Sequence, residues 1–395
     1  MPTVAVLMPD CEAGHVLPTL KLARSLQRRG HRICYVGGRD LSEKLQGYGM
    51  DSVSCFQDAL SGLQYGPLAR GEILDHIIPK MRPDVFITLS IFCLEALAIR
   101  LRYGVPVVLL RHHCSMLNRI EQMRSLVAQR LLWSSVGIDD LIRLAHDSGD
   151  QINSASRDLP ALLRDTVEIL LFPREFAVQE LRQDKKLIFA GTGIELDRSD
   201  GQFDWPVVDP YRKIVYCSLG TQAHVKRDLA RHFFQTVVDF ASKRVDLELI
   251  LSTGRSFSSH ELQWAAPNVH VVDWVPQLEI LKRAHVMLTH GGFGTIKECI
   301  LSGVPMIVFP LSRDQFASAE CVLDRGLGLR GDIAALSEES LSAQVDAILQ
   351  TPDILDRVSV MQKSFMNASL EMAIEGIEQA IATGVHDIRD GGCRS

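Results

Sequence analysis

The densest group of residues that could do chemistry lies between Trp274 and Gln315. An apolar run at residues 286–289 predicts a buried strand, and His290-Gly-Gly-Phe-Gly-Thr295 follows it at once. The pattern from Thr295 to Leu301 then predicts a helix. Glycines between a strand and a helix let backbone N–H groups approach a ligand, and the start of a helix favours negative charge. The sequence therefore predicts a phosphate-binding turn at residues 290–295.

A second apolar run, residues 305–310, ends in the polar stretch 312–315. Ligands of parallel α/β sheets bind outside the carboxyl ends of the strands, which is where both polar stretches fall. The ring of Trp274, the glycine turn and the pair Asp314–Gln315 would then meet at one edge of a sheet. Such a group suits a base, a diphosphate and a sugar.

His15 is the candidate general base in the first half of the chain. It follows Gly14 and the apolar run at residues 3–8, at the start of a predicted helix. The positive end of a helix disfavours imidazolium, so the ring would stay neutral and able to accept a proton. A helix-capping or surface histidine is the alternative for a single histidine in a loop.

The two stretches together resemble the signatures of the UDP-glycosyltransferases, nucleotide-sugar-dependent enzymes that glycosylate small lipophilic acceptors. Residues 13–18 are similar to the family's Gly-His-x-x-Pro element. The second half carries the ordered series Trp274, Gln277, His290, Gly292, Thr295, Glu298, Pro305, Pro310, Asp314 and Gln315. The resemblance implies the GT-B architecture, in which two doubly wound, Rossmann-like α/β domains face each other across a cleft.

The resemblance also implies roles for single residues. Trp274 would stack on uracil beside Val275 and Gln277, and Glu298 would contact the ribose hydroxyls, which favours UDP over dTDP. Asp314 and Gln315 would bind the sugar, a pair that often goes with glucose. The other donor-binding positions are Gly14, Thr221, His290, Gly292, Phe293, Gly294 and Thr295. Each role has a simpler alternative. Trp274 could be a core tryptophan, Gly291-Gly292 a tight strand–helix turn, Glu298 a solvated helix charge, and Asp314–Gln315 an exposed loop pair.

One position departs from the family pattern. The aspartate that usually orients the histidine base falls on Ser90, which could hydrogen-bond the ring but could not stabilise imidazolium by charge. Asp10, Glu12 or Glu95 could take the role instead, or the acceptor hydroxyl could be acidic enough to need no partner. His112 and His113, after residues 105–110, could line the acceptor pocket.

Apolar runs alternating with helical patterns predict the α/β class in both halves of the chain. A first domain is expected over residues 1–190, a linker rich in Gly, Asp and Pro over 191–213, a second domain over 214–382 and a tail over 383–395. Strands are expected at residues 3–8, 33–36, 51–55, 85–89, 105–110, 214–217, 247–252, 269–273, 286–289 and 305–310. The final helical pattern is expected over residues 354–382, and by resemblance the last helix returns to the first domain.

The overall composition is that of a globular protein. The 395 residues are 46% hydrophobic and 23% charged with a net charge of −6, which argues against nucleic acid as a partner. Nine cysteines scattered singly predict neither a zinc site nor a disulfide framework, and hence a reduced, cytoplasmic setting. No signal peptide and no membrane-spanning segment is expected. No Asp-x-Asp triplet occurs, so no metal or other cofactor is expected at the diphosphate.

The sequence thus predicts an inverting, metal-independent hexosyltransferase. It would move glucose from UDP-glucose onto a hydroxyl of a small apolar natural product. Two alternatives stay open: an isomerase similar to the UDP-sugar 2-epimerases, and a catalytically silent homologue that binds nucleotide and helps a partner enzyme.

Overall fold

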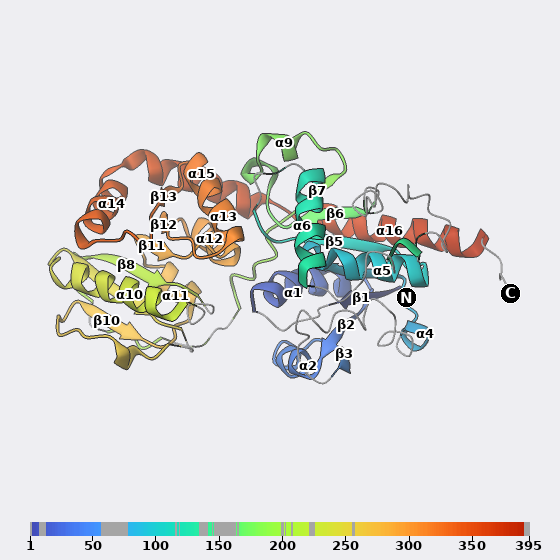
Figure 1. Cartoon of the computed structure of the whole chain (residues 1–395), viewed down its shortest axis with the longest axis horizontal. Helices are drawn as coiled ribbons and strands as arrows, with labels where there is room; N and C mark the ends of the chain where they lie inside the picture. Colours follow the sequence, from blue (N-terminus) through green and yellow to red (C-terminus); the bar gives the residue numbers. More distant parts are fainter. Residues whose placement is uncertain are drawn as a thin grey trace. The chain divides into compact units, whose positions relative to one another are not determined.

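The computed structural model describes residues 2–7, 13–56, 78–114, 117, 119–133, 141–143, 145, 163, 166–198, 201, 203–206, 208–220, 226–254 and 257–390. The chain forms two compact units (Figure 1). One contains Met1–His112, Leu117–Gly193 and Ala368–Ser395, and the other contains Ile194–Asn367 with His113–Met116. The boundary between Gly193 and Ile194 assigns nearly all of the expected linker, residues 191–213, to the second unit.

The first unit contains a parallel sheet of seven strands among its described residues, in the order β3-β2-β1-β4-β5-β6-β7. These strands are β1 (Thr3–Leu7), β2 (Arg32–Gly38), β3 (Ser52–Phe56), β4 (Val85–Leu89), β5 (Val107–Arg111), β6 (Val167–Leu170) and β7 (Leu187–Phe189). Continuous apolar runs form them because helices cover both faces of a parallel sheet. The sequence patterns predicted β1 to β5 but did not identify the short strands β6 and β7.

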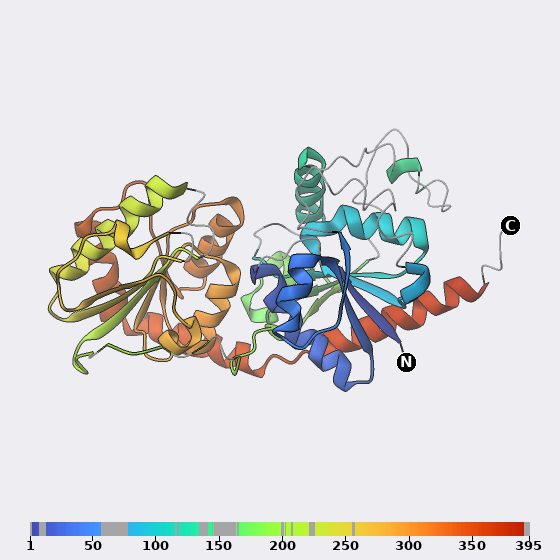
Figure 2. The same cartoon turned by 90° about the horizontal axis from the view of Figure 1, so that it is seen from below.

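Among its described residues the first unit contains the helices α1 (Ala13–Arg28), α2 (Arg39–Gln46), α4 (Ile78–Met81), α5 (Cys93–Tyr103), α6 (Arg119–Trp133), α9 (Gln179–Arg182) and α16 (Glu371–Asp390), with the 3₁₀ turns η2 (Ser90–Phe92) and η3 (Arg174–Phe176). α1 and α16 pack on one face of the sheet, where Leu20 and Ile377 share a core with Val6. α5 covers the opposite face, and Figure 2 shows α5 and α16 on the two sides of the sheet. The sequence pattern of residues 68–81 also predicts a helix, most of which lies outside the described residues.

The second unit contains a parallel sheet of six strands among its described residues, in the order β10-β9-β8-β11-β12-β13. They are β8 (Lys213–Ser218), β9 (Leu247–Ser252), β10 (Val269–Val272), β11 (Val286–Thr289), β12 (Met306–Val308) and β13 (Gly328–Arg330). Its helices are α10 (Arg227–Ser242), α11 (Gln277–Leu281), α12 (Phe293–Ser302), α13 (Arg313–Asp324), α14 (Glu338–Gln350) and α15 (Pro352–Asn367), with the turn η5 (Ser259–Glu261). The predicted α/β fold class with two parallel sheets is confirmed.

The end of the chain differs from the expectation in two respects. The helical pattern over residues 354–382 is divided between α15 and α16, since residues 368–370 are not helical. α16 continues to Asp390, so most of the expected tail at residues 383–395 is helical. Among the described residues, no helix combines the length and apolarity that a membrane span requires.

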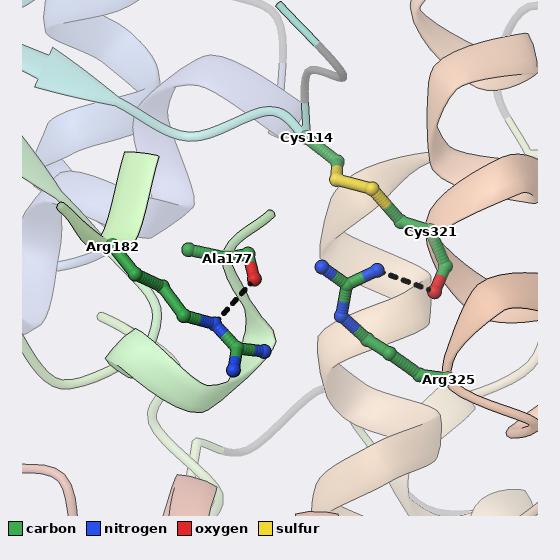
Figure 3. The surroundings of a disulfide bond; sticks show 5 residues. All are labelled: Cys114, Ala177, Arg182, Cys321 and Arg325. Atoms are coloured by element: carbon green, nitrogen blue, oxygen red, sulfur yellow. Dashed lines mark hydrogen bonds between the residues drawn. A yellow bond between two sulfur atoms is a disulfide. The ribbon is translucent and has the colours of Figure 1, made fainter. Parts of the chain in front are cut away.

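A disulfide bond joins Cys114 to Cys321 of α13 (Figure 3). The prediction that the cysteines form no disulfide is therefore wrong. The partners are 207 positions apart in the sequence, so only the fold brings them together, and single cysteines at such a distance carry no pairing signal. Because two of the cysteines are joined, the cysteines no longer support the expected reduced, cytoplasmic setting. Cys34, Cys93, Cys217 and Cys299 are buried and form no disulfide bond.

Candidate functional site

The predicted phosphate turn connects β11 to α12 in the second unit. β11 ends at Thr289, and α12 begins at Phe293 with Gly292 as its N-cap. Gly291 has φ +87°, a left-handed conformation that favours glycine, and a Cβ atom there would lie 2.6 Å from Cγ1 of Val308. A Cβ atom at Gly294 would meet no atom within 4 Å. The first N–H groups of α12 therefore lie at an open place where an anion can approach.

The ring of His290 lies between two glycines. A Cβ atom on Gly220 would be 2.6 Å from its Cε1, and one on Gly292 would be 2.6 Å from its Nε2. Burial lowers the pKa of His290 to about 4, although Asp314 and a backbone hydrogen bond at Ser218 act in the opposite direction. His290 is therefore a neutral hydrogen-bonding group near pH 7, and it would serve a diphosphate as an N–H donor and not as a cation.

Three of the predicted donor-binding residues form one hydrogen-bonded cluster. Nε2 of Gln277 donates to Oε2 of Glu298 over 2.6 Å and to Oγ1 of Thr295 over 3.3 Å. On the other side of the carboxylate, Nη2 of Arg198 lies 2.8 Å from Oε1 of Glu298. Arg198 was not predicted from the sequence, because a single arginine in a loop one hundred positions before Glu298 gives no local signal. Tyr216 completes the cluster, since its hydroxyl donates to Oε1 of Gln277 over 3.3 Å.

Trp274 follows β10 and is 43% exposed, so it is not the core tryptophan of the alternative interpretation. Its neighbour Val275 is buried. A Cβ atom on Gly201 would lie 3.8 Å from Cη2 and Cζ3 of the Trp274 ring, so the chain at Gly201 runs beside the indole. An exposed indole beside the carboxyl end of a parallel sheet can stack on a planar base.

Asp314 and Gln315 lie in the first turn of α13. Oε1 of Gln315 accepts the backbone N–H groups of Leu311 over 2.7 Å and of Ser312 over 3.0 Å, so this oxygen caps the helix. The hydroxyl of Ser312 donates to Oδ1 of Asp314 over 2.7 Å, and Asp314 is exposed. Of the two predicted sugar-binding groups, the carboxylate of Asp314 is the one that faces solvent.

His15 lies in the first turn of α1, one residue after Gly14. Its ring packs edge to face against two other rings, with centroids 5.2 Å away at His112 and 6.0 Å away at Phe92. Ser90 is fully buried, and its hydroxyl has no hydrogen-bond partner, so the structure does not contain a Ser90–His15 hydrogen bond. Glu95 is buried in α5. Thr221, Asp10 and Glu12 lie outside the described residues.

Comparison with known proteins finds relatives along nearly the whole chain. Residues 236–370 match the family of the C-terminal domain of erythromycin biosynthesis protein CIII-like proteins. The chain is 24% identical over 396 residues to the NDP-glycosyltransferase YjiC of Bacillus subtilis, covering 93% of each chain. It is 26% identical over 387 residues to the oleandomycin glycosyltransferase of Streptomyces antibioticus, covering 92% of this chain and 85% of that protein.

Solved structures of glycosyltransferases share the fold of this chain. The glycosyltransferase of kitacinnamycin superposes with a TM-score of 0.76 at 28% identity, over 96% of this chain and 100% of that one. The calicheamicin glycosyltransferase CalG4 shares the fold with a TM-score of 0.76 at 19% identity, over 97% and 98% of the two chains. The two α/β units and these comparisons together show a glycosyltransferase with the GT-B fold. More narrowly, the chain is similar to glycosyltransferases of natural-product type.

Proposed function

We propose that this glycosyltransferase moves a hexose, glucose from UDP-glucose, onto a hydroxyl of a small apolar natural product with inversion at the sugar carbon. The observation that carries the proposal is the arrangement around α12. An open helix N-terminus, a half-buried neutral histidine, a carboxylate–amide pair and an exposed indole all lie at the carboxyl edge of one parallel sheet.

Each part of this arrangement suits one part of a nucleotide sugar. The N–H groups at the start of α12 and the ring of His290 would receive the diphosphate, whose charge grows as it leaves. Trp274 would stack on the base, and the cluster of Gln277 and Glu298 would face the ribose. Asp314 would accept hydrogen bonds from the hexose hydroxyls.

His15 would act on the acceptor. The acceptor oxygen attacks C1 of the sugar while its proton passes to the imidazole, and the bond between C1 and the diphosphate oxygen breaks. Attack from the face opposite the leaving group turns an α-linked donor into a β-glycoside. The helix amides and His290 offset the charge of the departing diphosphate, so we propose that the reaction needs no metal ion.

The two other interpretations of the sequence are not favoured. The relatives and solved structures named above are glycosyltransferases, and none of them carries the name of an epimerase or of a helper protein. A mass-spectrometric screen of the purified protein against several nucleotide sugars and apolar acceptors tests the proposal. A hexosylated acceptor that forms with UDP-glucose is the expected result. An epimerised UDP-sugar without transfer, or no turnover with any UDP-sugar, would contradict it.

A further inference from the structure

Glu298 does not present a bare carboxylate to the nucleotide site. Oε1 lies 2.8 Å from Nη2 of Arg198, and Oε2 accepts a hydrogen bond of 2.6 Å from Gln277. The pair is well shielded from water, since the side chain of Arg198 is 12% exposed and that of Glu298 is 6% exposed. Both oxygens are therefore already engaged, and the negative charge of Glu298 is compensated by a guanidinium.

The segment that carries Arg198 also passes Trp274, the residue proposed to stack on the base. Three residues further on, Gly201 has φ +102° and runs beside the outer edge of the Trp274 ring. Trp205 lies further along the same segment. The guanidinium of Arg283 stacks on its ring, 4.0 Å from the ring centroid. The segment that was expected to be a linker thus contacts two residues of the proposed nucleotide site, Trp274 for the base and Glu298 for the ribose. Both contacts lie within the second unit.

From these contacts we propose that Arg198 is a specificity-determining residue that sets how strongly the enzyme distinguishes ribose from deoxyribose in its donor. The proposal rests on the nucleotide site assigned under the proposed function. An uncompensated carboxylate is a strong acceptor for a ribose hydroxyl, because hydrogen bonds to charged groups stabilise about twice as much as neutral ones. Since Arg198 compensates the charge of Glu298, the 2′-hydroxyl of a ribonucleotide gains little at this site. Donors that lack this hydroxyl are then bound nearly as well.

The experiment measures dissociation constants of UDP and dUDP by calorimetry for the full chain and its variants. These ligands differ only in the 2′-hydroxyl, so the ratio of the two constants isolates its contribution. For the unchanged protein we expect dUDP to bind within about threefold of UDP. In Arg198→Met the carboxylate loses its cation, and UDP should bind at least about tenfold more tightly than dUDP. The loss of a positive charge near the diphosphate affects both ligands alike and cancels in the ratio.

Two further variants separate this effect from damage to the fold. Arg212→Met is the matched control, because Arg212 also pairs with a buried carboxylate of the same unit, Glu248, at 3.2 Å. Its ratio should equal that of the unchanged protein. The double variant Arg198→Met with Glu298→Gln carries neither charge, and its ratio should return to about threefold.

The outcomes are distinct. A ratio in Arg198→Met that stays unchanged or falls would overturn the assignment, and so would a double variant that keeps the tenfold preference. If Arg198→Met does not fold, Arg198→Lys retains a cation and should keep the low ratio; a tenfold preference there would count against compensation of charge. Failure of the unchanged protein to bind either nucleotide would instead refute the proposed donor site itself.

Discussion

The ring of His15 lies edge to face against the ring of His112, with 5.2 Å between the centroids and 86° between the planes. Phe92 packs against His15 in the same manner at 6.0 Å. The strand order β1-β4-β5 produces this group, because it brings the residues that follow the carboxyl ends of three adjacent strands together. The proposed base thus packs against aromatic neighbours. The resemblance to the UDP-glycosyltransferases had instead implied an aspartate beside this histidine, at the position that Ser90 occupies.

Ring packing predicts a graded response at position 112. His112→Ala removes the ring and should lower kcat about tenfold by loosening His15, while His112→Phe keeps an aromatic ring and should retain most of the activity. The dissociation constant of UDP should not change, since none of the residues proposed to bind the donor is His112. Steady-state kinetics of both variants provide the measurement, and equal losses in the two would point to a chemical role of the imidazole instead.

Gly292 should be required for the position of His290. Its Cβ atom in Gly292→Ala would lie 2.6 Å from Nε2 of His290, so the ring must move out of place and UDP should bind about tenfold more weakly. Gly294→Ala is a control for folding only, because its methyl group would meet open space in this structure but would lie beside the proposed diphosphate. Thermal melting compares the folding of both variants, calorimetric titration with UDP measures the affinity of Gly292→Ala, and wild-type affinity of that variant would refute the prediction.

The pKa of His290 gives the stability of the protein an acid-sensitive component. Burial lowers this pKa from 6.5 to about 4, so between these pH values the unfolded chain binds a proton that the folded chain does not. The contribution is present above pH 6.5 and is lost as the pH falls through 4. Between pH 7 and pH 4.5 the unchanged protein should lose about 2 kcal/mol more free energy of unfolding than His290→Gln. Denaturant titrations at both pH values measure the difference, and equal losses would be contrary to the assignment.

Chelation should leave transfer unaffected. The amides of α12 and the ring of His290 are proposed to offset the charge of the diphosphate, so the rate with UDP-glucose should be the same within about twofold after dialysis against EDTA as after addition of Mg²⁺. Initial rates before and after dialysis are the readout. A strict requirement for a divalent ion would refute the metal-free proposal.

The parts of the fold that could be predicted are those encoded by contiguous residues. The apolar run 286–289, the glycines after it and the helix beyond specify β11 and α12 locally, and the structure places them as expected. The ion pair of Arg198 with Glu298 and the disulfide between Cys114 and Cys321 join residues 100 and 207 positions apart. No local periodicity marks such pairs, because the topology of the sheets and loops alone determines which residues meet.

The function expected of Ser90 shows a second limit. Counting along the strands correctly placed Ser90 directly after β4, but a sequence position does not give the direction of a side chain. In the structure the serine is buried without a hydrogen-bond partner. The ring of His112, which follows the neighbouring strand β5, packs against His15 instead.

The most direct test of the account compares His15→Ala with the unchanged protein in two assays. With UDP-glucose and the best acceptor from the screen, formation of the glycoside should fall at least about 100-fold, because general-base catalysis contributes that much or more. The dissociation constant of UDP should remain within about twofold, since the donor contacts described here do not include His15. Turnover of His15→Ala at the rate of the unchanged protein would contradict the central claim.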